Sequence, residues 1–246
     1  MTPRKRTRLA RVLSKMGYCS RSQASVLIRA GRVAVNGRVA RDPESPVRTL
    51  QDRIEVDGQP LDKSPAVYLI MNKPRGTVTT ASDEKGRATV YDLLEPGWPW
   101  VGPVGRLDKA SEGLLLLTND SEWAAKITDP SRHLDKKYHV QVDCVADEDL
   151  LARATQGCAV GDEHLRAKKA RLLRHGDKNS WLEITLDEGK NRQIRRLLEA
   201  LNVQVVRLVR VSIGPLELGD LKKGSVRRLM PEEKKEIDRA LGAKVG

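Results

Sequence analysis

The stretch Gly105–Asp120, GRLDKASEGLLLLTND, joins a charged loop to an apolar segment. Its apolar run, Leu114–Leu117, has the length and the polar boundaries of a buried strand. The loop before this strand places an acid, Asp108, between Arg106 and Lys109. Nearby cations favour the charged form of a carboxylate, and loops held by rigid elements often carry functional sites. We therefore expect Asp108 to be an ionised, positioned carboxylate beside cations that could hold a phosphate.

The segments around this stretch mix strand and helix patterns without strict βαβ alternation. Apolar runs and period-two alternation predict strands at residues 67–71, 138–142, 181–186 and 203–211. Helical spacing and capping residues predict helices at residues 121–127, 147–155, 191–201 and 231–241. The sequence therefore predicts an α+β protein whose larger domain, residues 67–246, has a mixed, largely antiparallel sheet flanked by helices.

The N-terminal residues 1–61 have the pattern of a separate, small α/β domain. Ser20 and Gln23 match a capping box that opens the second of two short amphipathic helices. An alternating segment around Asn36-Gly37 predicts a β-hairpin. Residues 62–66 are expected to be the linker to the larger domain.

Nearly all of the excess positive charge lies in this small domain. The 246-residue chain has 45 Lys and Arg against 33 Asp and Glu, a net charge of +12. Residues 1–41 contain eleven basic residues and no acidic one, so the remainder has 34 basic and 33 acidic residues. A concentrated basic module on a near-neutral body is typical of a polyanion-binding appendage. A merely solubilising surface would carry similar charge, but the segment also has the pattern of a folded unit, which favours nucleic acid.

Cysteine, histidine and hydropathy patterns argue against several classes of protein. The three cysteines are far apart in sequence and odd in number, so neither a disulfide framework nor a zinc site is expected, and a reducing cytoplasm fits the chain. The four histidines have no metal-like spacing. No apolar stretch is long enough to span a membrane, and the N-terminus lacks the apolar region of a signal peptide. We expect a cytoplasmic protein without a bound metal.

Residues 7–60 resemble the RNA-binding domain first seen in small-ribosomal-subunit protein four. The resemblance rests on RLARVLSKMGYCSRSQASVLIRAGRVAVNGR, residues 8–38, notably on Ser20-Arg21, Gly31 and Val35-Asn36-Gly37. Such domains occur in several RNA enzymes. The resemblance therefore implies contact with RNA, and it does not imply a reaction.

The stretch Gly105–Asp120 closely resembles the active-site motif of RNA pseudouridine synthases, in the branch of the bacterial ribosomal small-subunit pseudouridine synthase A. The resemblance covers most of residues 7–230 and includes a second motif at Asn72–Gly76. Ser111 stands where many members have Thr, and it retains the hydroxyl. The resemblance implies site-specific isomerisation of uridine to pseudouridine in ribosomal RNA, on a base flipped out of its stack. Because an isomerisation has no second substrate, no cofactor is expected, and the sequence has no nucleotide-binding motif.

The resemblance also assigns roles to three residues. The essential Asp of the motif matches Asp108, the Tyr of the family's KxY segment matches Tyr138, and the invariant Arg matches Arg195. The resemblance implies that Asp108 reacts with the nucleoside, that Arg195 holds the Asp108 carboxylate, and that Tyr138 stacks on the base and assists proton transfer. Without the resemblance, Asp108 would be interpreted as a residue that caps a turn or pairs with Arg106, and Tyr138 as an ordinary aromatic residue of a strand.

Helical spacing also singles out Arg195. An apolar stripe at residues 194, 197, 198 and 201 faces the core, and Arg195 falls on its edge, whereas Arg192 and Arg196 point outward. An Arg at the edge can reach into a cleft while its helix packs on the core. We therefore expect Arg195 to pair with Asp108, although spacing alone leaves a surface Arg without a defined bond equally open.

Further basic residues are expected to contact RNA. They are Arg8, Arg11, Arg21, Lys73, Arg75, Arg106 and Arg192. Glu112, close to Asp108, raises the alternative of a two-carboxylate site, but we interpret it as a solvated loop acid. The expected partners are small- or large-subunit ribosomal RNA and ribosomal assembly intermediates, and we expect the enzyme to be a monomer.

Two other functions compete with the isomerase. A non-catalytic RNA-binding or ribosome-assembly factor on the same scaffold would have no need of the complete set Asp108, Tyr138 and Arg195. An RNA methyltransferase with the same appendage is disfavoured, because the sequence has no Gly-rich loop after a strand that would hold a nucleotide-like cofactor.

Overall fold

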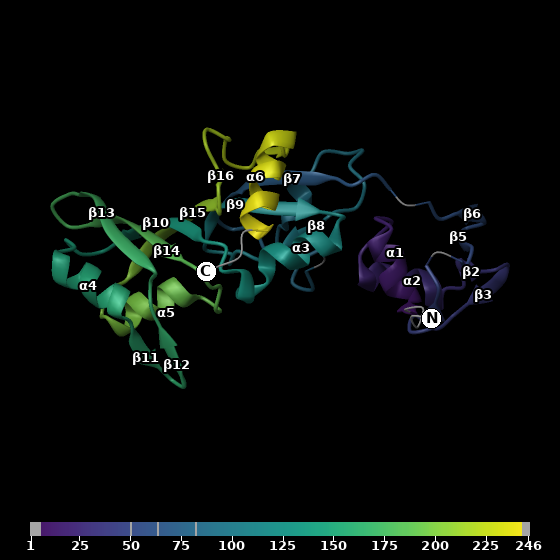
Figure 1. Ribbon diagram of the computed structural model, residues 1–246, viewed down its shortest axis with the longest axis horizontal. Helices are drawn as coiled ribbons and strands as arrows, with labels where there is room; N and C mark the ends of the chain where they lie inside the picture. The colour runs from purple at the N-terminus through teal and green to yellow at the C-terminus, as the bar shows by residue number, and fades with distance from the viewer. Residues whose placement is uncertain (1–5, 50, 63, 82, 243–246) are drawn as a thin grey trace. The chain divides into compact units, whose positions relative to one another are not determined.

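The computed structural model describes residues 6–49, 51–62, 64–81 and 83–242 (Figure 1). The chain divides into two compact units. The first comprises the chain up to Tyr68 with residues 94–103 and 117–123, and the second comprises residues 69–93, 104–116 and the chain from Ala124 onward. Within the described residues, no helix combines the length and the apolar character needed to cross a membrane.

Two short helices and two small sheets form the N-terminal part of the first unit. The helices are α1 (Leu9–Lys15) and α2 (Arg21–Arg29), β1 (Thr7–Arg8) pairs with β4 (Pro46–Val47), and a four-stranded sheet has the order β3 (Arg38–Ala40), β2 (Val33–Val35), β5 (Ile54–Val56), β6 (Gln59–Pro60). Leu9, Leu13 and Ile28 are fully buried in one core with strand residues. The predicted capping box is confirmed, because Ser20 Oγ accepts from the Gln23 N–H at 3.1 Å and Gln23 Oε1 accepts from the Ser20 N–H at 3.0 Å.

A nine-stranded sheet is the framework of the second unit. Its main path is β13 (Lys169–His175), β14 (Ser180–Leu186), β10 (Lys136–Val142), β15 (Val205–Ile213), β9 (Glu112–Thr118), β7 (Tyr68–Lys73) and β17 (Val226–Arg228), while β16 (Leu216–Glu217) pairs with β15 and β8 (Gly102–Val104) with β9. The remaining elements are α3 (Ser121–Thr128), α4 (Glu148–Gln156), α5 (Gln193–Ala200), α6 (Pro231–Gly242), the hairpin of β11 (Cys158–Val160) and β12 (Glu163–Leu165), and 3₁₀ helices at Val90–Leu93 and Pro130–Arg132. Strands β9 and β15 run parallel, whereas β10 is antiparallel to both β14 and β15, and β13 is antiparallel to β14. The predicted α+β fold is thus confirmed.

Alternation along the strands gives the sheet two different faces. Val140, Leu182, Ile184 and Leu208 are buried in one core with residues of α4 and α5. Figure 1 shows these two helices on the same side of β10, β13 and β14. The residues between the core positions therefore point to the opposite face of the sheet.

Strand β9 is buried at every position from Glu112 to Thr118, which confirms the strand predicted from its apolar run. In its parallel pairing with β15, Gly113 lies opposite Arg210. Gly113 has a φ of +102°, and a Cβ at this position would lie 2.2 Å from the carbonyl oxygen of Arg210. Glycine is required there, and the close approach fixes the start of β9, and with it the preceding loop, against β15.

Candidate active site

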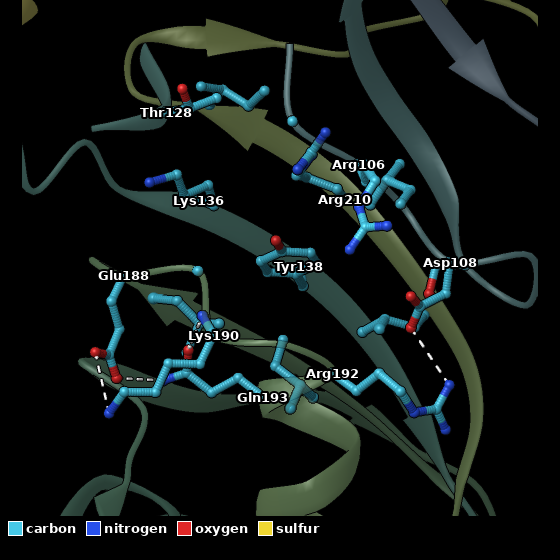
Figure 2. A pocket seen from close by; sticks show the side chains of 18 of the residues that line it. Arg106, Asp108, Thr128, Lys136, Tyr138, Glu188, Lys190, Arg192, Gln193 and Arg210 are labelled. Carbon is cyan, nitrogen blue, oxygen red and sulfur yellow. Dashed lines mark hydrogen bonds and ion pairs between the residues drawn. The ribbon is translucent and has the colours of Figure 1, made fainter. Parts of the chain in front are cut away.

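A cleft of about 510 Å³ contains two of the three residues predicted to be catalytic. Asp108 and Arg106 come from the loop before β9, Tyr138 from β10, Arg210 from β15, and Arg192 from the segment before α5. Figure 2 shows Asp108 and Arg192 facing each other at one end of this cleft, with Tyr138 on the strand beside them. A second hollow of about 450 Å³ is also lined by Arg106 and Asp108, so the carboxylate borders both.

Backbone hydrogen bonds fix the loop that carries Asp108. The Asp108 carbonyl oxygen accepts from the Ser111 N–H at 3.0 Å and from Lys73 Nζ at 3.1 Å. The Gly76 N–H donates to the Lys109 carbonyl at 2.8 Å. The Asp108 side chain remains 38% exposed. The carboxylate is therefore held in place and still reachable by a ligand.

Lys73 is a structural anchor of this loop, and its predicted contact with RNA is wrong for this structure. It lies in β7, and its side chain is fully buried. Its ammonium donates to the carbonyl oxygens of Ser111 at 2.9 Å, and of Asp108 and Pro74 at 3.1 Å each. Burial lowers the pKa of Lys73 to about 8, although the charges of Asp108 and Glu112 act in the opposite direction.

The partner of the Asp108 carboxylate is Arg192, at 3.3 Å, and the expected pairing with Arg195 is not found. The helical spacing was extended too far toward the N-terminus, because α5 begins only at Gln193. Arg192 is the residue before the helix and has a φ of +47°. Its side chain therefore does not follow the helical spacing that placed it on the outer face.

Arg195 acts on the loop backbone instead. Its guanidinium donates to the carbonyl oxygens of Ala110 at 3.2 Å and of Val205 at 3.0 Å. Burial lowers the pKa of Arg195, and the neighbouring charge of Arg192 lowers it further, against the opposing effect of Asp108. Ala110 lies two residues after Asp108, so Arg195 ties the loop to the start of β15.

Two cations of the cleft, the buried Arg210 and the half-buried Lys136, were missed from the sequence. Arg210 pairs with Tyr138 across β10 and β15 and is only 6% exposed. Its Nε donates to the Leu114 carbonyl at 2.8 Å, and its Nη2 has no hydrogen-bond partner in the described part of the chain. Burial lowers the pKa of Lys136, and the charge of Arg210 adds to that effect. The only signal in the sequence was alternation. Lys136 is two residues before Tyr138, and Arg210 is two residues after Leu208, so each points to the same face of the sheet as that neighbour.

Glu112 is not the solvated loop acid that the sequence suggested. It is the first residue of β9 and only 2% exposed. Its carboxylate accepts two hydrogen bonds from Arg207, at 2.8 and 3.1 Å, and lies 2.5 Å from Lys223. Burial alone would raise the pKa of Glu112, but the two cations outweigh it and the pKa is lowered. This acid faces away from the cleft and does not form a two-carboxylate site with Asp108.

The other residues expected to contact RNA lie at the surface. Arg75 and Arg106 are exposed in the second unit, Arg8, Arg11 and Arg21 are exposed in the first, and Arg8 forms an ion pair with Glu44. Their contacts with RNA stay predictions. Within the described residues, no three His, Cys, Asp or Glu side chains are grouped so as to hold a metal ion.

Comparisons with known proteins identify the class of this protein. The family model for RNA pseudouridylate synthase matches residues 67–200, and the S4 domain model matches residues 7–54. The chain is 38% identical to the ribosomal large subunit pseudouridine synthase B of Bacillus subtilis (strain 168), over 94% of this chain and 95% of that protein. It is 39% identical to an uncharacterized RNA pseudouridine synthase of Aquifex aeolicus (strain VF5), over 96% of each chain.

A solved structure described as a pseudouridylate synthase has the same fold, with a TM-score of 0.66 and 29% identity over 94% of this chain and 99% of that chain. The chain therefore belongs to the RNA pseudouridylate synthase family and has an S4 domain at its N-terminal end. It is an isomerase that converts uridine to pseudouridine in RNA, as the sequence predicted.

Proposed function

We propose that this isomerase modifies a uridine of large-subunit ribosomal RNA and that Asp108 is its catalytic carboxylate. The choice of RNA is supported by the name of the Bacillus subtilis relative, with which the chain aligns over 94% of its own length and 95% of that protein. This choice replaces the small-subunit branch suggested by the motif. We place the enzyme in the cytoplasm, acting as a monomer on RNA or on ribosomal assembly intermediates.

The observation that carries the catalytic assignment is the position of the Asp108 carboxylate. It is held by its loop, borders a cleft of about 510 Å³, and shares that cleft with the ring of Tyr138. A uracil must leave its stack to meet a protein carboxylate, at a cost of a few kcal/mol. The cleft offers an aromatic ring for stacking and cations for the phosphates beside the extruded base.

The reaction needs only groups that this chain supplies. The bond between N1 of uracil and C1′ of ribose breaks, the base turns, and a bond forms between C5 and C1′. The proton on C5 leaves and N1 gains one, so atoms balance without a second substrate. Asp108 reacts with the nucleoside, Arg192 neutralises and orients its carboxylate, and Tyr138 stacks on the base and assists proton transfer. Arg195 and Lys73 are positioning residues, since they hold the backbone of the loop.

The catalytic assignment is tested with Asp108→Asn, which keeps the size of the side chain and removes its charge. We expect turnover, measured as tritium released from [5-³H]uridine in the RNA, to fall by about 10³-fold or more. Binding of the same RNA should stay within about threefold of the wild type. Asp177→Asn, an exposed acid on the turn between β13 and β14, is the matched control and should turn over normally.

Retained turnover in Asp108→Asn would contradict the assignment. An absence of turnover in the wild type, with tight RNA binding, would instead favour a non-catalytic assembly factor. The choice of RNA is tested separately by mapping pseudouridines in both ribosomal RNAs of cells with and without the protein. A missing pseudouridine in the small-subunit RNA alone would contradict the large-subunit proposal.

A further inference from the structure

The sheet face opposite the catalytic cleft has a third hollow, of about 350 Å³. It is lined by His139, Leu173, Arg174, Trp181, Arg207 and Val209. Tyr138 and Arg210 line the catalytic cleft, whereas their chain neighbours His139 and Val209 line this hollow. Because successive strand residues point to opposite faces, the two sites lie on different sides of β10 and β15.

We call the sheet face opposite the catalytic cleft the outer face, and Trp181 lies among the residues that line its hollow. In the strand register, Trp181 of β14 lies opposite Arg174 of β13 on one side and Gln141 of β10 on the other, and Gln141 lies opposite Arg207 of β15. The Arg174 guanidinium lies 5.6 Å from the centroid of the indole, and that of Arg207 lies 5.8 Å from it. Both distances are in the range of a cation–π contact.

The two arginines differ in how firmly they are held. Arg207 donates two hydrogen bonds to the buried carboxylate of Glu112, so its position over the indole is fixed. Arg174 is exposed on β13, the edge strand of the sheet. Arg174 has no acidic partner within the described residues. It can therefore leave the ring and pair with a ligand while Arg207 keeps the ring in place.

The charge around Trp181 favours an anionic ligand. The same face carries Lys137, Lys169, Arg171, Arg174 and Arg207. Of its acids, Glu183 is engaged by Arg171 at 2.8 Å, and Glu217 lies 3.9 Å from Lys137. An aromatic side chain among cations on an open sheet is the arrangement that single-stranded nucleic acids use, with bases stacked on rings and phosphates held by cations.

We propose that the outer face of β13, β14, β10 and β15 binds a single-stranded segment of RNA, with one base stacked on Trp181 and Arg174 on an adjacent phosphate. The proposal rests on RNA being the substrate and adds a second contact region outside the catalytic cleft. A large folded RNA that contains the target uridine also has unpaired segments elsewhere, and this face would bind one such segment. The S4 domain is not required for this contact.

The test is ultraviolet cross-linking of the whole enzyme to octauridylate, followed by trypsin digestion and mass spectrometry. Trp181 falls on the tryptic peptide 179–190, which contains no other aromatic residue, while Tyr138 falls on a different peptide. We expect a cross-link on Trp181. Arg174→Ala should lower its yield about fivefold at subsaturating RNA, and the difference from the wild type should shrink as the salt concentration rises, because the wild type loses one more phosphate contact to screening. Arg153→Ala, which removes a cation from α4 on the covered side of the sheet, should leave the yield unchanged.

Binding of a single-stranded octamer supplies a second readout. Trp181→Ala should remove the component of binding that Arg174→Ala weakens, with a loss of about tenfold in affinity, and Trp181→Phe should restore most of it. The proposal is overturned if no cross-link maps to residues 179–190 while other peptides are cross-linked. It is also overturned if Arg174→Ala and Arg153→Ala give the same cross-link yield. That outcome would favour a protein as the partner of this face.

Asp108→Asn separates this proposal from the catalytic one. Because Asp108 lies on the other side of the sheet, the cross-link of this variant at Trp181 should equal that of the wild type. Normal turnover in Asp108→Asn would contradict the catalytic proposal without affecting the outer face. Absence of the Trp181 cross-link in an enzyme with normal turnover would contradict only the proposal that the outer face binds RNA.

Discussion

At the scale of single residues, the two arginines near Asp108 have different tasks. Arg192 forms an ion pair whose two side chains are 49% and 38% exposed. Arg195 supplies hydrogen bonds to two backbone carbonyls, one of them in the Asp108 loop. The first interaction acts on the charge of the carboxylate, and the second acts on where its loop lies.

We predict that Arg192→Ala lowers kcat while changing the free energy of unfolding by less than about 1 kcal/mol, because exposed ion pairs contribute little to stability. Arg195→Ala should also lower kcat, and it should reduce the free energy of unfolding by about 1–3 kcal/mol, since it deprives two carbonyls of their donor. Urea denaturation and single-turnover rates measure the two effects. A larger loss of stability in Arg192→Ala than in Arg195→Ala would contradict this division.

Lys73 gives the stability a dependence on pH that can be predicted in sign. Burial lowers its pKa from 10.5 to about 8. Below pH 8 the amine is charged in both the folded and the unfolded chain. Between pH 8 and 10.5 the folded chain loses this proton while the unfolded chain keeps it. The unfolded state then binds more protons, so this group raises the free energy of unfolding as pH rises through that window.

Lys73→Met removes this contribution and the three hydrogen bonds. We predict that the variant is less stable than the wild type by about 1–3 kcal/mol at pH 7. The difference should widen between pH 8 and 10.5 by at most about 1.4 kcal/mol per pH unit. Urea titrations of both proteins at several pH values measure the difference, in which other titrating groups cancel. A difference that narrows with rising pH would show that the pKa is not lowered.

The identities of the site residues were easier to predict than their contacts. The family motifs identified Asp108 and Tyr138, and both line one cleft. The sequence could not show that Lys73 is buried, because NKPRG has the composition of an exposed turn. Arg192 was placed outward because helical spacing was applied to a residue with positive φ. Backbone conformation at the end of a helix is set by tertiary contacts that spacing does not contain.

At the scale of elements, the pairing of β9 with β15 determines where the catalytic loop begins. We predict that Gly113→Ala lowers the free energy of unfolding by about 4 kcal/mol, because the new Cβ meets the backbone of Arg210 in a conformation that L residues avoid. Gly176→Ala, whose nearest neighbouring atom is 4.0 Å away, is the matched control and should cost less than about 1 kcal/mol. Chemical denaturation of the two variants decides the point, and equal stabilities would contradict it.

Elements with local signals were predicted closely. The capping box of Ser20 and Gln23, the helix predicted at residues 147–155 and the apolar run of β9 each lie where the sequence placed them. Errors arose at element ends. Strand β9 includes Glu112, so an acid expected in solvent is buried and paired. Its burial depends on Arg207 and Lys223, which lie far away in the sequence.

At the scale of the whole molecule, the uneven distribution of charge is the property most directly readable from the sequence. Residues 1–41 carry the excess of basic side chains, and the S4 domain model covers residues 7–54. We infer that residues 1–61 dock on RNA phosphates. The structure distinguishes the arginines of this region, because Arg8 is paired with Glu44 whereas Arg21, the first residue of α2, has no acidic partner within the described residues.

This difference predicts unequal effects on the salt dependence of RNA binding. Removing one cation that neutralises a phosphate should reduce the slope of log affinity against log salt by ~0.7 on a single strand and ~0.9 on a duplex. We expect this reduction for Arg21→Ala and a smaller one for Arg8→Ala, whose guanidinium must first leave Glu44. Filter-binding titrations across salt concentrations measure both slopes. An unchanged slope and affinity in Arg21→Ala would remove that residue from the RNA interface, and equal slopes for the two variants would show that the Glu44 ion pair does not withhold Arg8 from the phosphates.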